Sequence, residues 1–198
     1  FAATGPVVAE LEHPITLARC RALLGLGRWK EVADLAERKL EELYASKPDE
    51  KRFILEYHIA AGRAAWRIGR PSRAEEHFRA AYHISRWDFE DLEGMLRSRN
   101  LLGLCFLGAG EIQRAVGEFA RGQLQARAAG LYHEEANVTL NLSIALAKLG
   151  RFERADQELA RARALFGERG HSRGKVQARL CRGQGLRASA RRRRRPDP

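Results

Sequence analysis

The feature that most constrains the fold is a glycine that recurs at intervals of 42, 41 and 40 residues. Each of these glycines follows an apolar stretch and precedes a second stretch whose apolar residues have helical spacing. The four positions are Gly27, Gly69, Gly110 and Gly150. A fixed period of this length indicates a fold built from stacked supersecondary units rather than around one central core.

Residues with small side chains accompany each glycine at fixed distances. Seven residues before it come Cys20, Gly62, Gly103 and Ser143, and five residues after it come Val32, Ala74, Ala115 and Ala155. Two helices approach closely only where the side chains at their contact are small. We therefore expect a helix–turn–helix unit in which the glycine ends the first helix in a left-handed conformation that a Cβ atom would oppose.

Apolar residues recur with helical spacing and no segment alternates with period two, so we expect an all-α protein. The predicted helix pairs are 14–26 and 28–45, 50–68 and 71–85, 89–108 and 111–129, and 133–149 and 151–166. The corresponding repeats are 13–48, 49–87, 88–130 and 131–167. Residues 1–12 are expected to be a lead-in or the end of a preceding element. Residues 168–188 are expected to hold a capping helix over about 173–188, and 189–198 a basic disordered tail.

The order of small residue, glycine, aromatic, alanine and large apolar residue resembles the tetratricopeptide (TPR) repeat. Trp29 and Phe152 occupy the aromatic place, where the other two repeats have Ile112 and Pro71. The period exceeds the usual 34 residues and the usual final proline is missing; HEAT repeats also have such a period, but the fixed glycine and alanine favour the TPR alternative. Long repeats of this kind resemble those of kinesin light chains and of bacterial maltose-activator-like regulators. The resemblance implies an α–α superhelix, a right-handed solenoid.

The resemblance also implies which residues face a peptide-binding groove. In TPR proteins these places lie on the first helix of each repeat. Carried onto this chain they are Glu56, Ile59, Arg63, Arg67, Arg97, Asn100, Leu104, Asn137, Asn141 and Ile144. Among them, Arg63 and Arg97 have the forked donors that hold a carboxylate, and Asn141 has the donor and acceptor needed to bind a peptide backbone. Trp66 is interpreted as part of the core between repeats.

The net charge of +11 lies entirely at the C-terminal end, since residues 161–198 contain 13 basic and 2 acidic residues. The segment ends in Arg191, Arg192, Arg193, Arg194 and Arg195. Such a run can neutralise phosphates, so nucleic-acid binding is the alternative function. The run also fits compositional bias, and no aromatic residue follows Phe166 to stack on a base.

No pattern of catalytic or metal-ligating residues accompanies the repeats. The six histidines are scattered without an HExxH motif, and we interpret them as surface or helix-end residues. Cys20, Cys105 and Cys181 lack the spacing of a zinc site or a disulfide framework, which favours buried thiols in a reducing compartment. The sequence therefore predicts no enzyme activity and no cofactor. It also predicts no membrane span, because its longest uncharged apolar stretch has ten residues.

Together these features predict a cytoplasmic, non-catalytic protein-interaction module. We expect it to bind a peptide or helix of a partner and to form the sensor or scaffold part of a larger bacterial regulatory protein.

Overall fold

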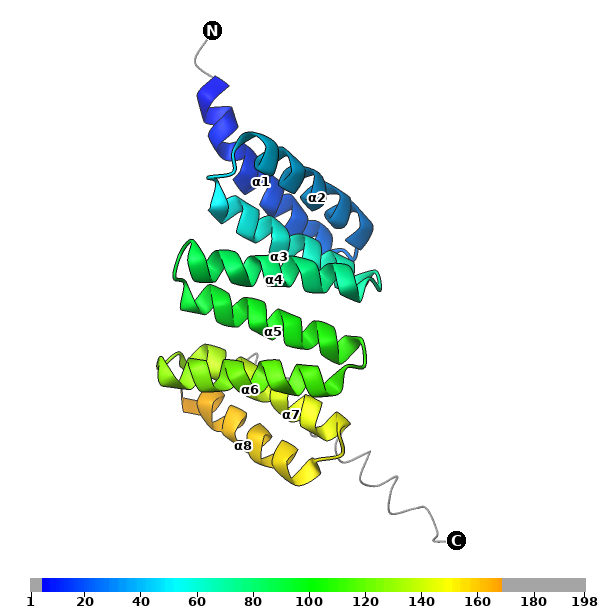
Figure 1. Ribbon diagram of the computed structural model, residues 1–198, viewed down its shortest axis with the longest axis vertical. Helices are drawn as coiled ribbons and strands as arrows, with labels where there is room; N and C mark the ends of the chain where they lie inside the picture. Colours follow the sequence, from blue (N-terminus) through cyan, green and yellow to red (C-terminus); the bar gives the residue numbers. More distant parts are fainter. Residues whose placement is uncertain (1–4, 169–198) are drawn as a thin grey trace. The chain divides into compact units, whose positions relative to one another are not determined.

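The computed structural model describes residues 5–168, which form eight α-helices and no strand (Figure 1). The helices are α1 (Gly5–Gly25), α2 (Trp29–Ser46), α3 (Lys51–Arg67), α4 (Pro71–Trp87), α5 (Leu92–Gly108), α6 (Ile112–Ala128), α7 (Tyr132–Lys148) and α8 (Phe152–Glu168). None of them is long and apolar enough to cross a lipid bilayer. The predicted capping helix and basic tail lie outside the described residues. The all-α fold class is therefore confirmed for 5–168.

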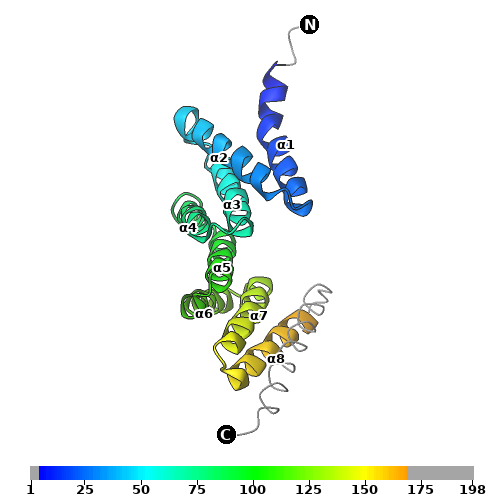
Figure 2. The same cartoon turned by 90° about the vertical axis from the view of Figure 1, so that its right-hand side faces the viewer.

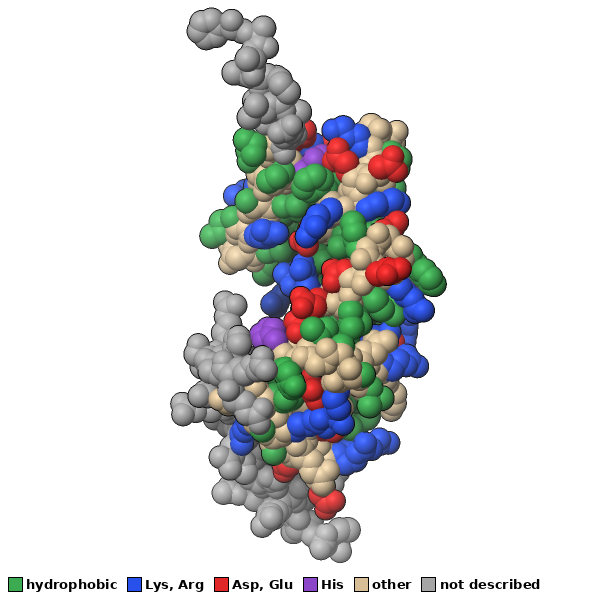
Figure 3. Space-filling view, turned by 90° about the vertical axis from the view of Figure 1, so that its left-hand side faces the viewer, with side chains coloured by type: hydrophobic (Ala, Val, Ile, Leu, Met, Phe, Trp, Pro, Cys, Tyr) green, Lys and Arg blue, Asp and Glu red, His purple; other side chains and the backbone are tan. Residues whose placement is uncertain are grey.

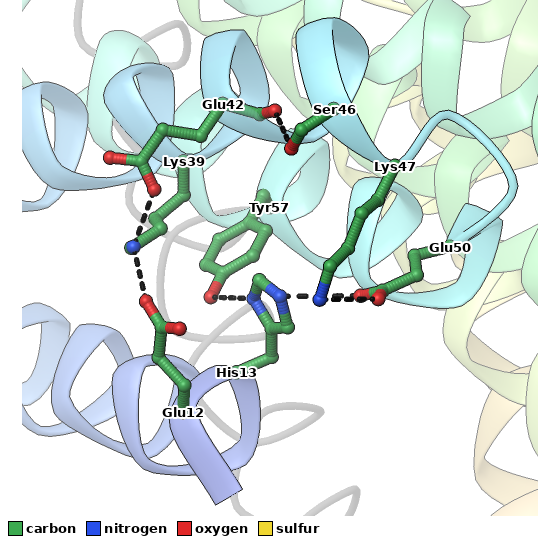
Figure 4. A network of polar contacts seen from close by, with 8 residues as sticks. All are labelled: Glu12, His13, Lys39, Glu42, Ser46, Lys47, Glu50 and Tyr57. Carbon is green, nitrogen blue, oxygen red and sulfur yellow. Dashed lines mark hydrogen bonds and ion pairs between the residues drawn. The ribbon is translucent and has the colours of Figure 1, made fainter. Parts of the chain in front are cut away.

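The bounds of α2 to α8 agree with the predicted helices to within three residues, whereas α1 begins at Gly5 instead of residue 14. The sequence analysis predicted this helix over 14–26, and a proline in a helix interior lacks the N–H that the helix requires. Instead Pro14 lies inside α1. The turn before it is held by His13, which is buried and lies 3.1 Å from the Tyr57 hydroxyl and 3.2 Å from Glu50 (Figure 4).

The four glycines end the first helices as predicted, with φ angles between 75° and 82°. In each turn the backbone N–H one residue after the glycine bonds to the carbonyl five residues earlier, as from Arg28 to Leu23 at 3.0 Å and from Arg151 to Leu146 at 3.0 Å. This is the bond that closes a Schellman cap. The same local hydrogen bond therefore ends α1, α3, α5 and α7.

The small residues that flank the turns are buried, which confirms their predicted place at helix contacts. Val32, Ala74 and Ala115 have no exposed surface. At Gly62 on α3, a Cβ atom would lie 2.6 Å from the ring of Phe78 on α4. The absence of a side chain at Gly62 is thus what allows α3 and α4 to pack.

The chain divides into two compact units, with the boundary between Cys105 and Phe106 inside α5. In unit 1, up to Cys105, α1 and α2 pack on each other and on α3, and α3 packs on α4. In unit 2, from Phe106, α6 packs on α7 and α7 on α8; Figure 2 shows α7 and α8 side by side. A cluster of buried residues between α7 and α8 contains Ala136, Leu140, Leu159, Ala162 and Phe166.

A pair of glycine substitutions tests the packing at Gly62. Gly62→Ala should lower the free energy of unfolding by about 1–3 kcal/mol, because the new methyl group meets the Phe78 ring. Gly117→Ala, inside α6 with open space around its Cβ, should raise it by about 0.5–1 kcal/mol. Urea unfolding followed by circular dichroism measures both. Equal effects of the two substitutions would contradict the close contact.

Candidate functional site

Three arginines gather around one glutamate on the first helices of unit 1. Glu56 on α3 lies 3.5 Å from Arg21 on α1 and 3.3 Å from Arg97 on α5. Two of these residues, Glu56 and Arg97, were predicted to face a groove, and the structure brings them into contact. Both arginines are well exposed, so the ion pairs leave other guanidinium donors in contact with solvent.

Arg63 is the third arginine of this cluster. Burial lowers the pKa of Arg63, and the positive charges of Arg97 and Arg21 lower it further, while Glu56 acts in the opposite direction. Arg63 as a residue is exposed, and its guanidinium group keeps its positive charge. The cluster has a local surplus of two positive charges. Figure 3 shows basic and acidic side chains interspersed over one face of the molecule, so a surplus in one cluster is a local feature.

Arg21 was not among the predicted groove residues, although the repeat contains the signal for it. Arg21 lies six residues before its turn glycine, as Arg63 does in the next repeat. The prediction took groove residues only from the second, third and fourth repeats. Applying the same rule to the first repeat would have identified Arg21.

The other predicted groove residues have different environments. Ile59 is buried with 4% of its surface exposed, so it contributes to the core. The Arg67 guanidinium lies 5.3 Å from the Trp29 ring centre and 5.2 Å from that of Trp66, which is half-buried. Asn100 and Leu104 on α5 are half-buried in unit 1, as are Asn137, Asn141 and Ile144 on α7 in unit 2. The structure brings together Glu56, Arg63 and Arg97. The predicted basic residues Arg191 to Arg195 lie outside the residues that the structure describes.

The prediction that the histidines are surface or helix-end residues is wrong for three of them. His13, His58 and His77 are buried, whereas His83 and His133 are exposed. Burial was unpredictable from spacing because each ring finds a polar partner on another helix. The described residues contain no group of three or more His, Cys, Asp or Glu side chains that could hold a metal ion.

Two of the buried histidines form a hydrogen-bonded chain through α2, α3 and α4. The Tyr44 hydroxyl lies 2.9 Å from His58 Nε2, His58 Nδ1 lies 3.0 Å from His77 Nδ1, and His77 Nε2 lies 3.4 Å from Glu37. A carboxylate only accepts hydrogen bonds, so His77 donates to Glu37 from Nε2 and accepts at Nδ1. His58 then donates from Nδ1, and the Tyr44 hydroxyl donates to His58 Nε2. Every bond of the chain is satisfied when both imidazoles are neutral.

Burial, the charge of His77 and that of Arg73 lower the pKa of His58 from 6.5 to about 4. Burial likewise lowers the pKa of His77, partly offset by its bond to Glu37. The arrangement keeps both rings neutral and is suited to joining three helices.

A separate buried carboxylate, Glu135 in unit 2, is held at 2.7 Å by Arg161 and at 3.2 Å by Arg127, which gives it a structural role between helices.

Comparison with known proteins assigns the fold to a class. No protein-family model and no curated protein sequence matches the chain. Among solved structures, it is similar to a putative kinesin light chain with nearly identical TPR-like repeats from Podosopora anserina, with a TM-score of 0.73 and 16% identity over 93% of this chain and 88% of that one. The chain is also similar to BtubC (BKLC) from P. vanneervenii, with a TM-score of 0.64 and 16% identity over 90% of this chain and 80% of that one.

The aspartyl phosphate phosphatase F from Bacillus subtilis gives a TM-score of 0.78 at 15% identity, over 88% of this chain. The chain spans 45% of the length of that phosphatase and 66% of that of RapI, a further neighbour. The chain therefore has the fold of TPR-like helical-repeat proteins, which confirms the resemblance seen in the sequence, including that to kinesin light chains. At these identities the likeness concerns the fold.

The histidine chain predicts how stability depends on pH. The unfolded chain binds a proton at His58 near pH 6.5 and the folded chain only near pH 4, so the free energy of unfolding should fall as the pH drops below 6.5. Between pH 7.5 and 5.5 the loss from His58 should be about 1 kcal/mol, and His77 adds to it in the same direction.

Urea unfolding at the two pH values measures this loss. The variant His58→Gln should show a smaller loss, because glutamine does not titrate and can still accept from Tyr44 and donate to His77. The exposed His83→Gln should behave as the unaltered chain does. A pH dependence that survives in His58→Gln and disappears in His83→Gln would refute the assignment.

Proposed function

We propose that the protein is a non-catalytic interaction module that binds an acidic or carboxylate-bearing peptide segment of a partner on the first helices of unit 1. The observation that carries this proposal is the surplus of arginine around Glu56. TPR-like repeat proteins commonly mediate protein–protein interaction, which supports the general class. The finer proposal, a cytoplasmic sensor or scaffold within a larger bacterial regulator, rests on the same fold together with the neighbouring phosphatase and RapI structures.

The chemistry of the cluster favours an anionic ligand. Guanidinium groups present paired donors that match a carboxylate. The three arginines come from three successive first helices, α1, α3 and α5, so a ligand that contacts all of them must extend along unit 1. An acidic segment of extended peptide meets these requirements.

Binding of a fluorescein-labelled decaglutamate peptide, followed by fluorescence anisotropy, tests the proposal. Arg63→Ala combined with Arg97→Ala should weaken binding at least about tenfold, since charge-assisted hydrogen bonds are worth about 1.5–3 kcal/mol each. The matched control is Arg38→Ala with Arg79→Ala, which removes the same charge from the second helices α2 and α4, where both residues are exposed. The control variant should retain most of the affinity for decaglutamate.

Removing the competing carboxylate should have the opposite effect. Glu56→Gln releases Arg21 and Arg97 from their ion pairs and raises the positive surplus, so affinity for decaglutamate should increase several-fold. The gain should shrink at high salt, which screens exposed charges. Equal losses in the arginine variant and its control, together with no gain in Glu56→Gln, would overturn this location for the site.

A further inference from the structure

Helix α1 is apolar on two opposite faces, and unit 1 covers only one of them. The covered face contains His13, Leu17, Cys20 and Leu23, which are buried against the unit. The other face is an exposed stripe along the helix, defined here as Leu11, Ile15, Ala18 and Ala22. Leu11 and Ile15 are 49% and 63% exposed. Figure 2 shows α2 and α3 on one side of α1 within this unit.

Most of the stripe positions are buried where they recur in α3 and α7. The counterparts of Leu11, which are Phe53 and Glu134, and the counterpart of Ala18 in α7, which is Asn141, are half-buried. In α3, the residues at the same distances from the turn glycine as Ile15, Ala18 and Ala22 are Tyr57, Ala60 and Ala64, which are 0%, 7% and 0% exposed. Helix α3 packs against the preceding hairpin, α1 and α2. In α7, which packs on α6, the corresponding Val138 and Ala145 are 1% and 0% exposed. Among the described residues of unit 1, no helical hairpin lies before α1.

The sizes of the four side chains point to what covers the stripe. Their spacing of four, three and four residues is that of a helix seam in a coiled coil. The two large residues, Leu11 and Ile15, lie in the N-terminal half, and the two alanines lie in the C-terminal half. An antiparallel pair of identical stripes places each large side chain against an alanine, Leu11 on Ala22 and Ile15 on Ala18. A parallel pair would place leucine on leucine and leave a gap between alanines.

The charges beside the stripe fit the same arrangement. Glu12 and Arg19 each directly follow a stripe residue, so they flank it on one side. In the antiparallel register, Glu12 of one copy lies opposite Arg19 of the other, and the two-fold axis generates this pair twice. Both side chains are exposed in the single chain, and Glu12 is also paired with Lys39 at 2.5 Å.

We propose that the exposed stripe of α1 is a self-association surface, on which a second copy of this chain docks its own α1 in antiparallel orientation. The seam is about three helical turns long, so the interface is small and the dimer should be a weak one, with a dissociation constant on the order of micromolar. This proposal is independent of the peptide site, because the stripe shares no residue with the arginine cluster.

Sedimentation equilibrium of the full chain over a range of concentrations tests the proposal. The unaltered chain should show a monomer–dimer equilibrium. Ile15→Lys should weaken it at least about tenfold, because it places a charge in the apolar seam. The matched control Leu124→Lys makes the same change at an equally exposed position of α6, 62% against 63%, and should leave the equilibrium unchanged. Circular dichroism and urea unfolding verify that both variants remain folded.

Charge reversal tests the orientation. Glu12→Arg alone and Arg19→Glu alone should each weaken the dimer several-fold, and the double variant should restore it, because each pair is re-formed with its signs exchanged. A chain that stays monomeric at all concentrations overturns the proposal and assigns the stripe to a further helical hairpin or another protein. Dimers that are insensitive to Ile15→Lys, or charge-reversal effects that add instead of cancelling, also overturn it.

Discussion

The structure depends on the burial of one face of the first helices α3 and α7 against the helices that precede them. Helices of 17 residues are marginal alone in water, so α3 and α7 are stable because the preceding helices cover their apolar residues. That contact requires small residues at the crossings, as Gly62 shows where it meets Phe78. It also leaves the residues beside the covered face in contact with solvent, where Arg63 and Arg97 are exposed and Glu56 is half-buried. Packing and the candidate site are thus two consequences of the same repeat.

Polar groups inside unit 1 follow a different principle from those on its surface. The chain from Tyr44 through His58 and His77 to Glu37 satisfies its donors and acceptors while the imidazoles stay neutral, so its burial does not require a buried cation. Around Glu56, by contrast, positive charge exceeds negative charge and remains accessible. The interior therefore contributes stability that decreases in mild acid, whereas the surface retains an attraction for anions that salt weakens.

Much of the fold was predictable because its signals are local. The turn glycines, the small residues beside them and the bounds of α2 to α8 follow from helix periodicity and capping, which depend on residues close in sequence. The start of α1 was not predictable in this way, since contacts of His13 with Tyr57 and Glu50 continue the helix through Pro14. For the site, the repeat register identified Glu56, Arg63 and Arg97, and it places Ile59 in a position that the fold buries.

The sequence alone determined that this is an all-α repeat protein with hairpins joined at Gly27, Gly69, Gly110 and Gly150, because a left-handed cap and a helical period are properties of short segments. Only the tertiary structure decided which side chains meet across helices. It buried His13, His58 and His77, drew Arg21 to Glu56, and left Ile15 exposed while its counterpart Tyr57 is covered. Burial and electrostatic environment are set by residues far apart in the chain, and a repeat pattern does not specify them.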